Sequence, residues 1–165
     1  MSEVNRLAQL VVERSAGMAL YARQWLDAAS ADDVVQEALA ALLIQRRPPD
    51  DPVAWTYRAV RNAAIDHARS ASRRRRREQV VAGTRREWFE QSADAAMDAR
   101  TAEEALRRLP EELREVVILR IWGGLGFAAI AAVANASVST VHKRYATALR
   151  QLRVALEKPC GNKID

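Results

Sequence analysis

Helical periodicity is the feature that most constrains the fold of this chain. In the first 26 residues, apolar side chains recur at steps of three and four, at Val4, Leu7, Val11, Met18, Tyr21 and Trp25. A stripe with that spacing lies on one face of a helix and does not fit a strand, whose period is two. The six glycines and five prolines stand mostly between such segments, and alternating β-branched runs are absent. The sequence therefore predicts an all-α fold.

Helix start and stop signals divide the chain into two parts. Ser30 can cap a second helix, which must end before Pro48 because a proline disfavours helical geometry in the residue preceding it. Pro52 suits the first turn of a third helix, expected to reach about Ser72. Further helices are predicted from Pro110 to the glycine pair at 123–124, over 127–134 and over 139–158. We therefore expect two small helical domains, 1–77 and 102–165, joined by a flexible linker over 78–101.

Charge and composition limit the function classes. The 26 Lys and Arg residues exceed the 21 acids, giving a net charge of +5, and nucleic acid is a favoured partner of a basic surface. No apolar run approaches the roughly 20 residues that span a bilayer, and no secretory leader is visible. The single cysteine, Cys160, cannot form an internal disulfide, and with only two histidines it completes no zinc site. We expect a cytoplasmic protein without metal or cofactor, in which Cys160 has no role.

The sharpest local signal is a helix-turn-helix pattern near the end of the chain. A short apolar helix over 127–134 is followed by Asn135, which tolerates a left-handed turn, and by Ser137 or Ser139, either of which can cap the next helix. On that next helix the side chains predicted to face the core are Val141, Tyr145, Ala148, Leu152 and Leu156. The opposite face carries Ser139, Lys143, Ala146 and Arg150, flanked by Thr140, His142 and Thr147. Such a small, polar and basic face suits a DNA major groove, although an ordinary solvated face has a similar composition.

A second basic stripe lies on the predicted third helix. It consists of Arg58, Arg61, Asn62, Ile65 and Arg69 and leads into five consecutive arginines at 73–77. Guanidinium groups with an adjacent amide suit a nucleic-acid backbone and an unpaired base. Trp55 and Tyr57 are either core anchors or stacking platforms, with the core favoured for Trp55. Taken alone, an arginine run of this kind is usually a solvated, partly disordered hinge.

Together these segments resemble the extracytoplasmic-function (ECF) sigma factors, the smallest members of the bacterial sigma family. The first block is DDVVQEALAALL, followed by AWTYRAVRNAAIDHARS and the arginine run. The second block is LPEELREVVILR, followed by IAAVANASVSTVHKR. The resemblance covers roughly 15–77 and 102–156, and both blocks stand in the order that the family shows.

The resemblance implies a role for each segment. Core RNA polymerase would be bound by Asp32, Asp33, Gln36 and Glu37. The −10 promoter element would be read and melted by Trp55, Tyr57, Arg58, Arg61, Asn62, Asp66 and Arg69, with the loop 46–52 receiving a flipped base. The −35 element would be contacted by Ser139, Thr140, His142, Lys143, Arg144, Ala146 and Thr147. The family further implies an anti-sigma factor as a partner, and a linker that passes through the RNA path of the polymerase.

The chain departs from the family pattern at several positions. Ser139 replaces a glycine, the run His142-Lys143-Arg144 replaces Lys-Ser-Arg, and Ala128-Ala129 replaces an acidic pair. Two other functions remain open: a sigma mimic that binds only an anti-sigma factor, and a stand-alone helix-turn-helix regulator. The mimic should lose its basic DNA faces, and the regulator should carry a dimerising or ligand-binding domain. An enzyme is not expected, because no glycine-rich phosphate loop is present.

Overall fold

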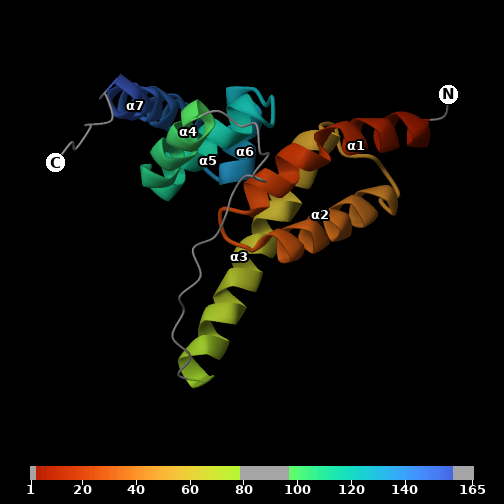
Figure 1. The fold of residues 1–165 in the computed structure, drawn as a ribbon. Helices are drawn as coiled ribbons and strands as arrows, with labels where there is room; N and C mark the ends of the chain where they lie inside the picture. Colours follow the sequence, from red (N-terminus) through yellow and green to blue (C-terminus); the bar gives the residue numbers. More distant parts are fainter. Residues whose placement is uncertain (1–2, 79–96, 158–165) are drawn as a thin grey trace.

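The chain folds into helices alone over the part that the structure describes. The computed structural model describes residues 3–78 and 97–157, which contain no strand (Figure 1). The helices are α1 (Glu3–Ala22), α2 (Ala28–Leu43), α3 (Pro52–Glu78), α4 (Met97–Arg108), α5 (Glu111–Ile121), α6 (Phe127–Ala134) and α7 (Val138–Glu157). Within these two ranges, no helix combines the length and the apolar character needed to cross a membrane. The all-α prediction is confirmed.

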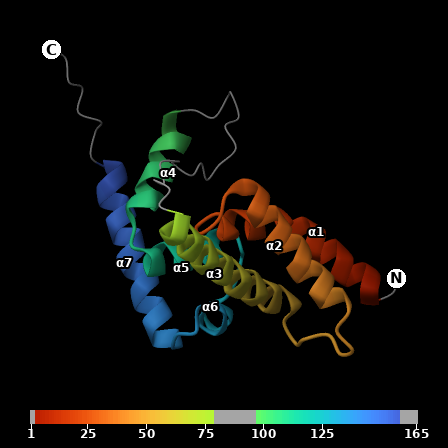
Figure 2. The same cartoon turned by 90° about the horizontal axis from the view of Figure 1, so that it is seen from below.

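The helices form two bundles. Helices α1, α2 and α3 pack against one another in the N-terminal bundle, and α7 contacts α4, α5 and α6 in the C-terminal bundle. Figure 2 shows α1 and α2 on one side of α3 and the C-terminal bundle on the other. Buried apolar side chains such as Met18 and Val60 fill the first bundle, and Ile118 and Ile130 fill the second. The predicted division into two helical domains is confirmed.

Capping residues set where two of the helices begin. Asp27, and not Ser30, caps α2: its carboxylate Oδ1 accepts a hydrogen bond from the Ser30 backbone N–H at 2.8 Å. The helix therefore starts earlier than predicted. At α7 the cap is Ser137, whose Oγ accepts from the Thr140 N–H at 3.1 Å. The turn before it is left-handed at Asn135 (φ 52°, ψ 49°), as predicted.

Helix α3 is longer than predicted. It continues through the arginine run to Glu78, and all five arginines are exposed. Arginine is a good helix former, and cations favour the last turn of a helix because of its dipole. The end of α3 extends away from both bundles in Figure 1. Most of the predicted linker (79–96), together with Cys160, lies outside the described residues, whereas 97–101 belong to α4.

The predicted core stripes are largely in place. Met18, Tyr21 and Trp25 are buried, while the side chains of Val4 and Val11 lie outside the described residues. On α7, Val141 and Ala148 are buried, and Tyr145 and Leu152 pack against the core as half-buried side chains. Leu156 was predicted to face the core and is instead 50% exposed, because it lies in the last turn of α7, one residue before the helix ends.

Candidate polymerase and DNA interfaces

The four predicted polymerase-binding residues share the outer face of α2. The buried side chains of this helix are Ala31, Val34, Val35, Ala38 and Leu42. The remaining face presents the exposed residues Asp32, Asp33, Gln36 and Glu37. Helical geometry thus gathers three carboxylates and an amide on one solvent-facing surface that no described helix covers.

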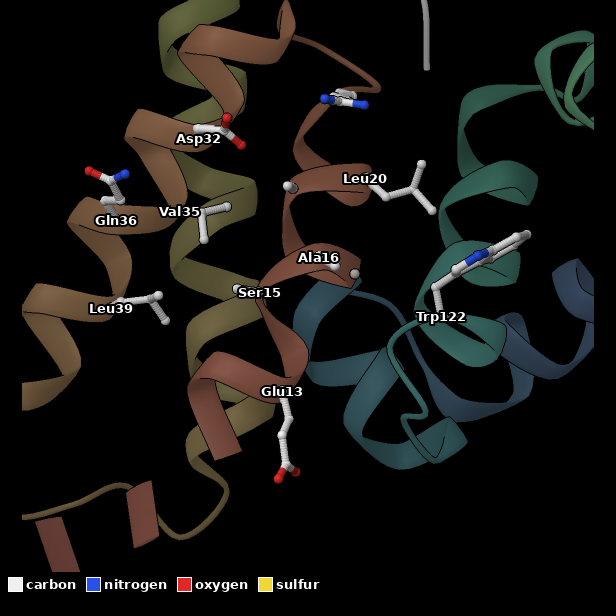
Figure 3. Close-up of a pocket in the computed structure, with 12 residues that line it drawn as sticks. Glu13, Ser15, Ala16, Leu20, Asp32, Val35, Gln36, Leu39 and Trp122 are labelled. Carbon is white, nitrogen blue, oxygen red and sulfur yellow. The ribbon is translucent and has the colours of Figure 1, made fainter. Parts of the chain in front are cut away.

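A groove runs beside this acidic face. It has a volume of about 750 Å³ and lies between α1 and α2, with Trp122 at the end of α5 closing one side (Figure 3). Val35 and Leu39 contribute an apolar wall, and Asp32 and Gln36 supply polar groups from the same helix. The groove therefore joins part of the predicted polymerase face to the C-terminal bundle.

The predicted DNA stripe on α3 is divided by the fold. Arg58, Asn62, Asp66 and Arg69 are exposed, and they can meet a partner as the protein stands. Trp55 is half-buried. Arg61 is also half-buried, and its guanidinium is directed to the C-terminal bundle, where it forms an ion pair.

Tyr57 lies in the core and has no exposed surface. Its ring packs edge to face against Tyr21, with centroids 5.5 Å apart. The hydroxyl is buried without a hydrogen-bond partner among the described residues, and burial raises the pKa of Tyr57 to about 12. The prediction that Tyr57 contacts DNA does not fit this arrangement. The alternative prediction, that Tyr57 is a core anchor, fits, because the helical periodicity of α3 places this position on the buried face with Val60 and Ala64.

A buried polar cluster joins the two bundles, and we call it the interbundle cluster: Tyr21, Arg61 and Glu115. The Glu115 carboxylate Oε1 accepts hydrogen bonds from the Tyr21 hydroxyl at 2.5 Å and from Arg61 Nε at 2.6 Å. Glu115 is only 2% exposed, although it stands on α5 and both donors belong to the N-terminal bundle.

The pKa values follow from this geometry. Burial, followed by the negative charge of Glu115, raises the pKa of Tyr21 well above 10, so the phenol stays a neutral donor. For Arg61, burial acts to lower the pKa, but the hydrogen bond and charge of Glu115 outweigh it and the pKa is raised. In the cluster, a neutral hydroxyl and a guanidinium therefore both donate hydrogen bonds to one carboxylate.

Two further hydrogen bonds extend the contact between the bundles. Trp25 Nε1 donates to Glu111 Oε1 at 3.0 Å, and Arg14 Nη1 donates to the Gly123 carbonyl at 2.7 Å. Helix α6 also packs against α3, and α1 against α5. The buried residues of the two bundles consequently form one continuous core cluster.

The glutamate at position 115 was not predicted as functional, although the sequence carries a signal for it. Residues 115–119 are all buried, so the middle of α5 is covered on every side, whereas both of its ends are exposed. A helix that is apolar all round belongs in the centre of a structure. The apolar run VVIL directly after Glu115 is the signal for such a segment. A glutamate beside it is expected to be buried against a neighbouring element and to need a polar partner there.

The predicted recognition face lies on the outside of α7. Ser139, His142, Lys143 and Ala146 are exposed, and Thr140, Arg144 and Thr147 are partly exposed. The His142 ring packs on Phe127 of α6, with centroids 4.0 Å apart, and the Arg120 guanidinium lies 4.7 Å from the centre of the same Phe127 ring. These contacts restrict the orientation of His142 at the start of the face.

Comparison with known proteins identifies the family. Residues 18–74 match the family model of sigma-70 region 2, and residues 99–152 match that of sigma-70 region 4. The ECF RNA polymerase sigma factor SigL of Mycobacterium tuberculosis (strain H37Rv) is 33% identical over 141 residues, which cover 80% of this chain and 77% of SigL. The chain belongs to the ECF sigma factors. It is accordingly an RNA polymerase sigma factor, and the predicted family is confirmed.

Two solved structures share the fold. The sigma factor RpoE of Bartonella quintana, in complex with the anti-sigma factor NepR, superposes with a TM-score of 0.72 at 19% identity, covering 93% of this chain and 96% of RpoE. CnrH, in complex with the cytosolic domain of CnrY, gives a TM-score of 0.60 at 24% identity, covering 91% of this chain and 86% of CnrH. The ECF sigma factor described here thus has the helical architecture of its relatives across both bundles.

Proposed function

We propose that this sigma factor distributes promoter recognition over three faces. The acidic face of α2 (Asp32, Asp33, Gln36 and Glu37) binds core polymerase. The α3 stripe reads and melts the −10 element through Arg58, Arg61, Asn62, Asp66 and Arg69, with Trp55 at its start. The outer face of α7 binds the −35 element. The observation that carries the proposal is that two basic helical faces stand on separate bundles, each largely exposed.

The chemistry of the α7 face supports its assignment to duplex DNA. A helix can enter the major groove when the side chains on its leading face are small, and Ser139 and Ala146 meet that condition. Lys143 and Arg144 supply positive charge for phosphates or guanine edges. His142, held against Phe127, presents a ring that can donate or accept one hydrogen bond, and we expect it to influence base preference.

Binding both promoter elements requires the bundles to separate. The −10 and −35 elements lie several turns of duplex apart, and one turn measures about 34 Å. In the structure α6 lies against α3, so the two bundles are held together. The 18 residues between the ends of α3 and α4 provide a chain length of roughly 60 Å when fully extended. The connection is thus long enough to let the bundles part.

An anti-sigma factor is the second partner that we propose. The solved relatives RpoE and CnrH are each in complex with a regulator, NepR and CnrY. The groove between α1 and α2 supports a similar arrangement here, because Asp32 and Gln36 line it and also belong to the polymerase face. A regulator in this groove would compete with polymerase. We place the protein in the cytoplasm, where polymerase and promoter DNA meet.

Run-off transcription with core polymerase over a promoter library tests the proposal. Lys143→Ala is expected to reduce −35-dependent initiation about tenfold while core binding is unchanged, because one contact to base or phosphate contributes roughly 1–3 kcal/mol. Arg153→Ala, on an exposed later turn of α7, is the matched control and should have little effect. Asp33→Arg should weaken core binding, with Glu112→Arg on α5 as its control.

Two results would contradict the proposal. If the chain neither binds core polymerase nor directs initiation from any template, the assignment of the three faces is wrong. Specific promoter binding by the chain alone, unaffected by added polymerase, would favour a stand-alone regulator.

A further inference from the structure

The interbundle cluster pairs groups that no single bundle could satisfy. Glu115 belongs to the C-terminal bundle, yet its carboxylate accepts from Tyr21 and Arg61 of the N-terminal bundle. A buried carboxylate requires such partners, because an unpaired charge in the protein interior is very costly. The two faces are therefore complementary, donor to acceptor, at the centre of their contact.

The cluster also holds Arg61, a residue that the proposed function requires at the −10 element. Arg61 stands in the α3 stripe between Arg58 and Arg69, both of which are exposed. With its Nε 2.6 Å from Glu115 Oε1, the Arg61 side chain is directed away from any DNA that approaches the exposed part of the stripe. Helix α6 of the C-terminal bundle also packs against α3.

We propose that the interbundle cluster is an autoinhibitory contact: it holds the sigma factor closed and withholds Arg61 from the −10 element until polymerase separates the bundles. The inference rests on the proposed role of Arg61 in −10 recognition. The C-terminal bundle thus acts as an internal competitor of promoter DNA, with the Glu115 carboxylate in the place of a DNA phosphate.

The physical chemistry of the contact suits a reversible switch. Desolvation offsets much of the attraction within a buried ion pair, so the cluster gives specificity more than net stability. The unpartnered Tyr57 hydroxyl lies close to the same contact, since both it and the Trp122 carbonyl border Gly17. On opening, Glu115 and Arg61 gain water together and neither is left as a lone buried charge. The free energy of polymerase binding can supply the difference in free energy between the closed and the open state.

Single-molecule energy transfer on the full chain tests the proposal. In a Cys160→Ser background, one dye is attached at Gln45→Cys after α2 and the other at Arg153→Cys on α7, both of which are exposed positions. Glu115→Gln removes the charge and keeps the shape of the side chain. We expect it to lower the closed-to-open ratio about tenfold to 100-fold, because it leaves the half-buried Arg61 guanidinium beside an uncharged group. Glu112→Gln removes the same charge from an exposed position of α5 and should leave the ratio unchanged.

Affinity for core polymerase is the second measurement on the same variants. If only the open form binds, the apparent affinity falls in proportion to the open fraction. If Glu115→Gln raises the open fraction by a given factor, its affinity for core polymerase should therefore rise by the same factor. This readout detects the effect even when both proteins are mostly closed. Equal transfer efficiencies and equal core affinities for Glu115→Gln and Glu112→Gln would overturn the proposal, as would opening without any gain in affinity.

A second variant guards against loss of folding. Tyr21→Phe keeps the ring and its edge-to-face contacts with Trp25 and Tyr57 but removes one donor to Glu115. It should open the chain in the same direction by about tenfold, the typical effect of losing one hydrogen bond to a charged group. Far-UV circular dichroism establishes that the helices remain. If Glu115→Gln loses its helices, Tyr21→Phe decides, and an unchanged ratio then overturns the proposal.

Failure of this inference can be told from failure of the proposed function. The energy-transfer measurement contains neither DNA nor polymerase, so it reports on closure whatever Arg61 does at a promoter. Arg61→Ala, assayed by run-off transcription in the Glu115→Gln background, reports on −10 recognition alone. If that variant initiates normally, the role of Arg61 in DNA binding is wrong, and the cluster then has no DNA-binding residue to withhold.

Discussion

An alanine at position 17 is expected to destabilise the protein, although intrinsic helix propensity predicts the reverse. Gly17 lies within α1, where replacing glycine by alanine ordinarily stabilises by about 0.8–1 kcal/mol. Here a Cβ at this position would lie 2.7 Å from the Tyr57 hydroxyl and 3.0 Å from the Trp122 carbonyl oxygen. One of these neighbours is a buried side chain of the same bundle and the other is backbone of the C-terminal bundle. The close approach of three segments thus depends on the missing methyl group.

The magnitude follows from two opposing effects. Inserting a methyl group into a packed interior costs about 1–3 kcal/mol, against the helix-propensity gain of up to about 1 kcal/mol. We therefore expect a net loss of about 1 kcal/mol in the free energy of unfolding. For a chain of 165 residues this corresponds to a fall in Tm of about 2–4 °C. If the clash is relieved by parting the bundles, the interbundle contacts will weaken as well.

Thermal and urea unfolding followed by circular dichroism measures the effect. Ser15→Ala, two residues earlier on α1, is the matched control and should gain a few tenths of a kcal/mol from helix propensity. Gly17→Ala should cost less stability in a Tyr57→Phe background than in the wild-type protein, because the nearer of the two clashing atoms is then absent. The reasoning is refuted if Gly17→Ala stabilises the protein as Ser15→Ala does, because the close approach would then be without consequence.

Three further perturbations test individual features of the structure. Asp27→Ala removes the cap of α2 and should cost about 1 kcal/mol in urea unfolding, whereas Ser30→Ala should cost only a few tenths; equal losses would contradict the assignment of the cap. Asn135→Gly should be neutral or slightly stabilising and Asn135→Ala should destabilise by about 1 kcal/mol, because only glycine adopts a left-handed φ without strain; similar melting of the two variants would argue against the turn. Tyr57→Phe should stabilise the protein by about 1 kcal/mol at pH 7 by removing an unpartnered hydroxyl. The pKa of Tyr57 is raised from 10.0 to about 12, so the wild-type protein should lose stability as the pH rises from 10 towards 12. The variant should lose less, and identical alkaline profiles would show that Tyr57 is accessible to solvent.

Local features of the fold were predictable because each has a local cause. The left-handed turn at Asn135, the bounds of α6 and the start of α5 after Pro110 follow from the conformational preferences of single residues. Errors arose where two residues could serve the same purpose. Asp27 and Ser30 are both of a residue type that caps helices, and in the structure the cap is Asp27. The third helix was expected to end near Ser72, whereas α3 continues through the arginine run to Glu78, since arginine is a good helix former.

The sequence could predict which helix faces carry the candidate site residues, but not which of these residues pair with each other. Periodicity placed Lys143 and Arg150 of α7 on an exposed surface, and the family resemblance pointed to the α2 acids, which are exposed as well. It could not indicate that Arg61 pairs with Glu115, because 54 positions separate the two residues and each looks like an ordinary surface charge on its own helix. Tyr57 was likewise undecided from sequence, since an aromatic residue beside a basic stripe suits either core or stacking. The ion pair between the bundles settles the case of Arg61, and the burial of Tyr57 against Tyr21 settles the other.

The helical arginine run at the end of α3 has a geometric consequence for how charge is displayed. Successive residues of a helix point about 100° apart, so the five guanidinium groups at 73–77 encircle the rod. Only Arg73 and Arg76 continue the line from Arg69, and Arg73 is steadied there by its hydrogen bond to Ser70 Oγ at 3.3 Å. The other three point to different sides. The tip of α3 therefore presents positive charge in every direction, whereas the exposed stripe nearer the body of the molecule presents it along one line.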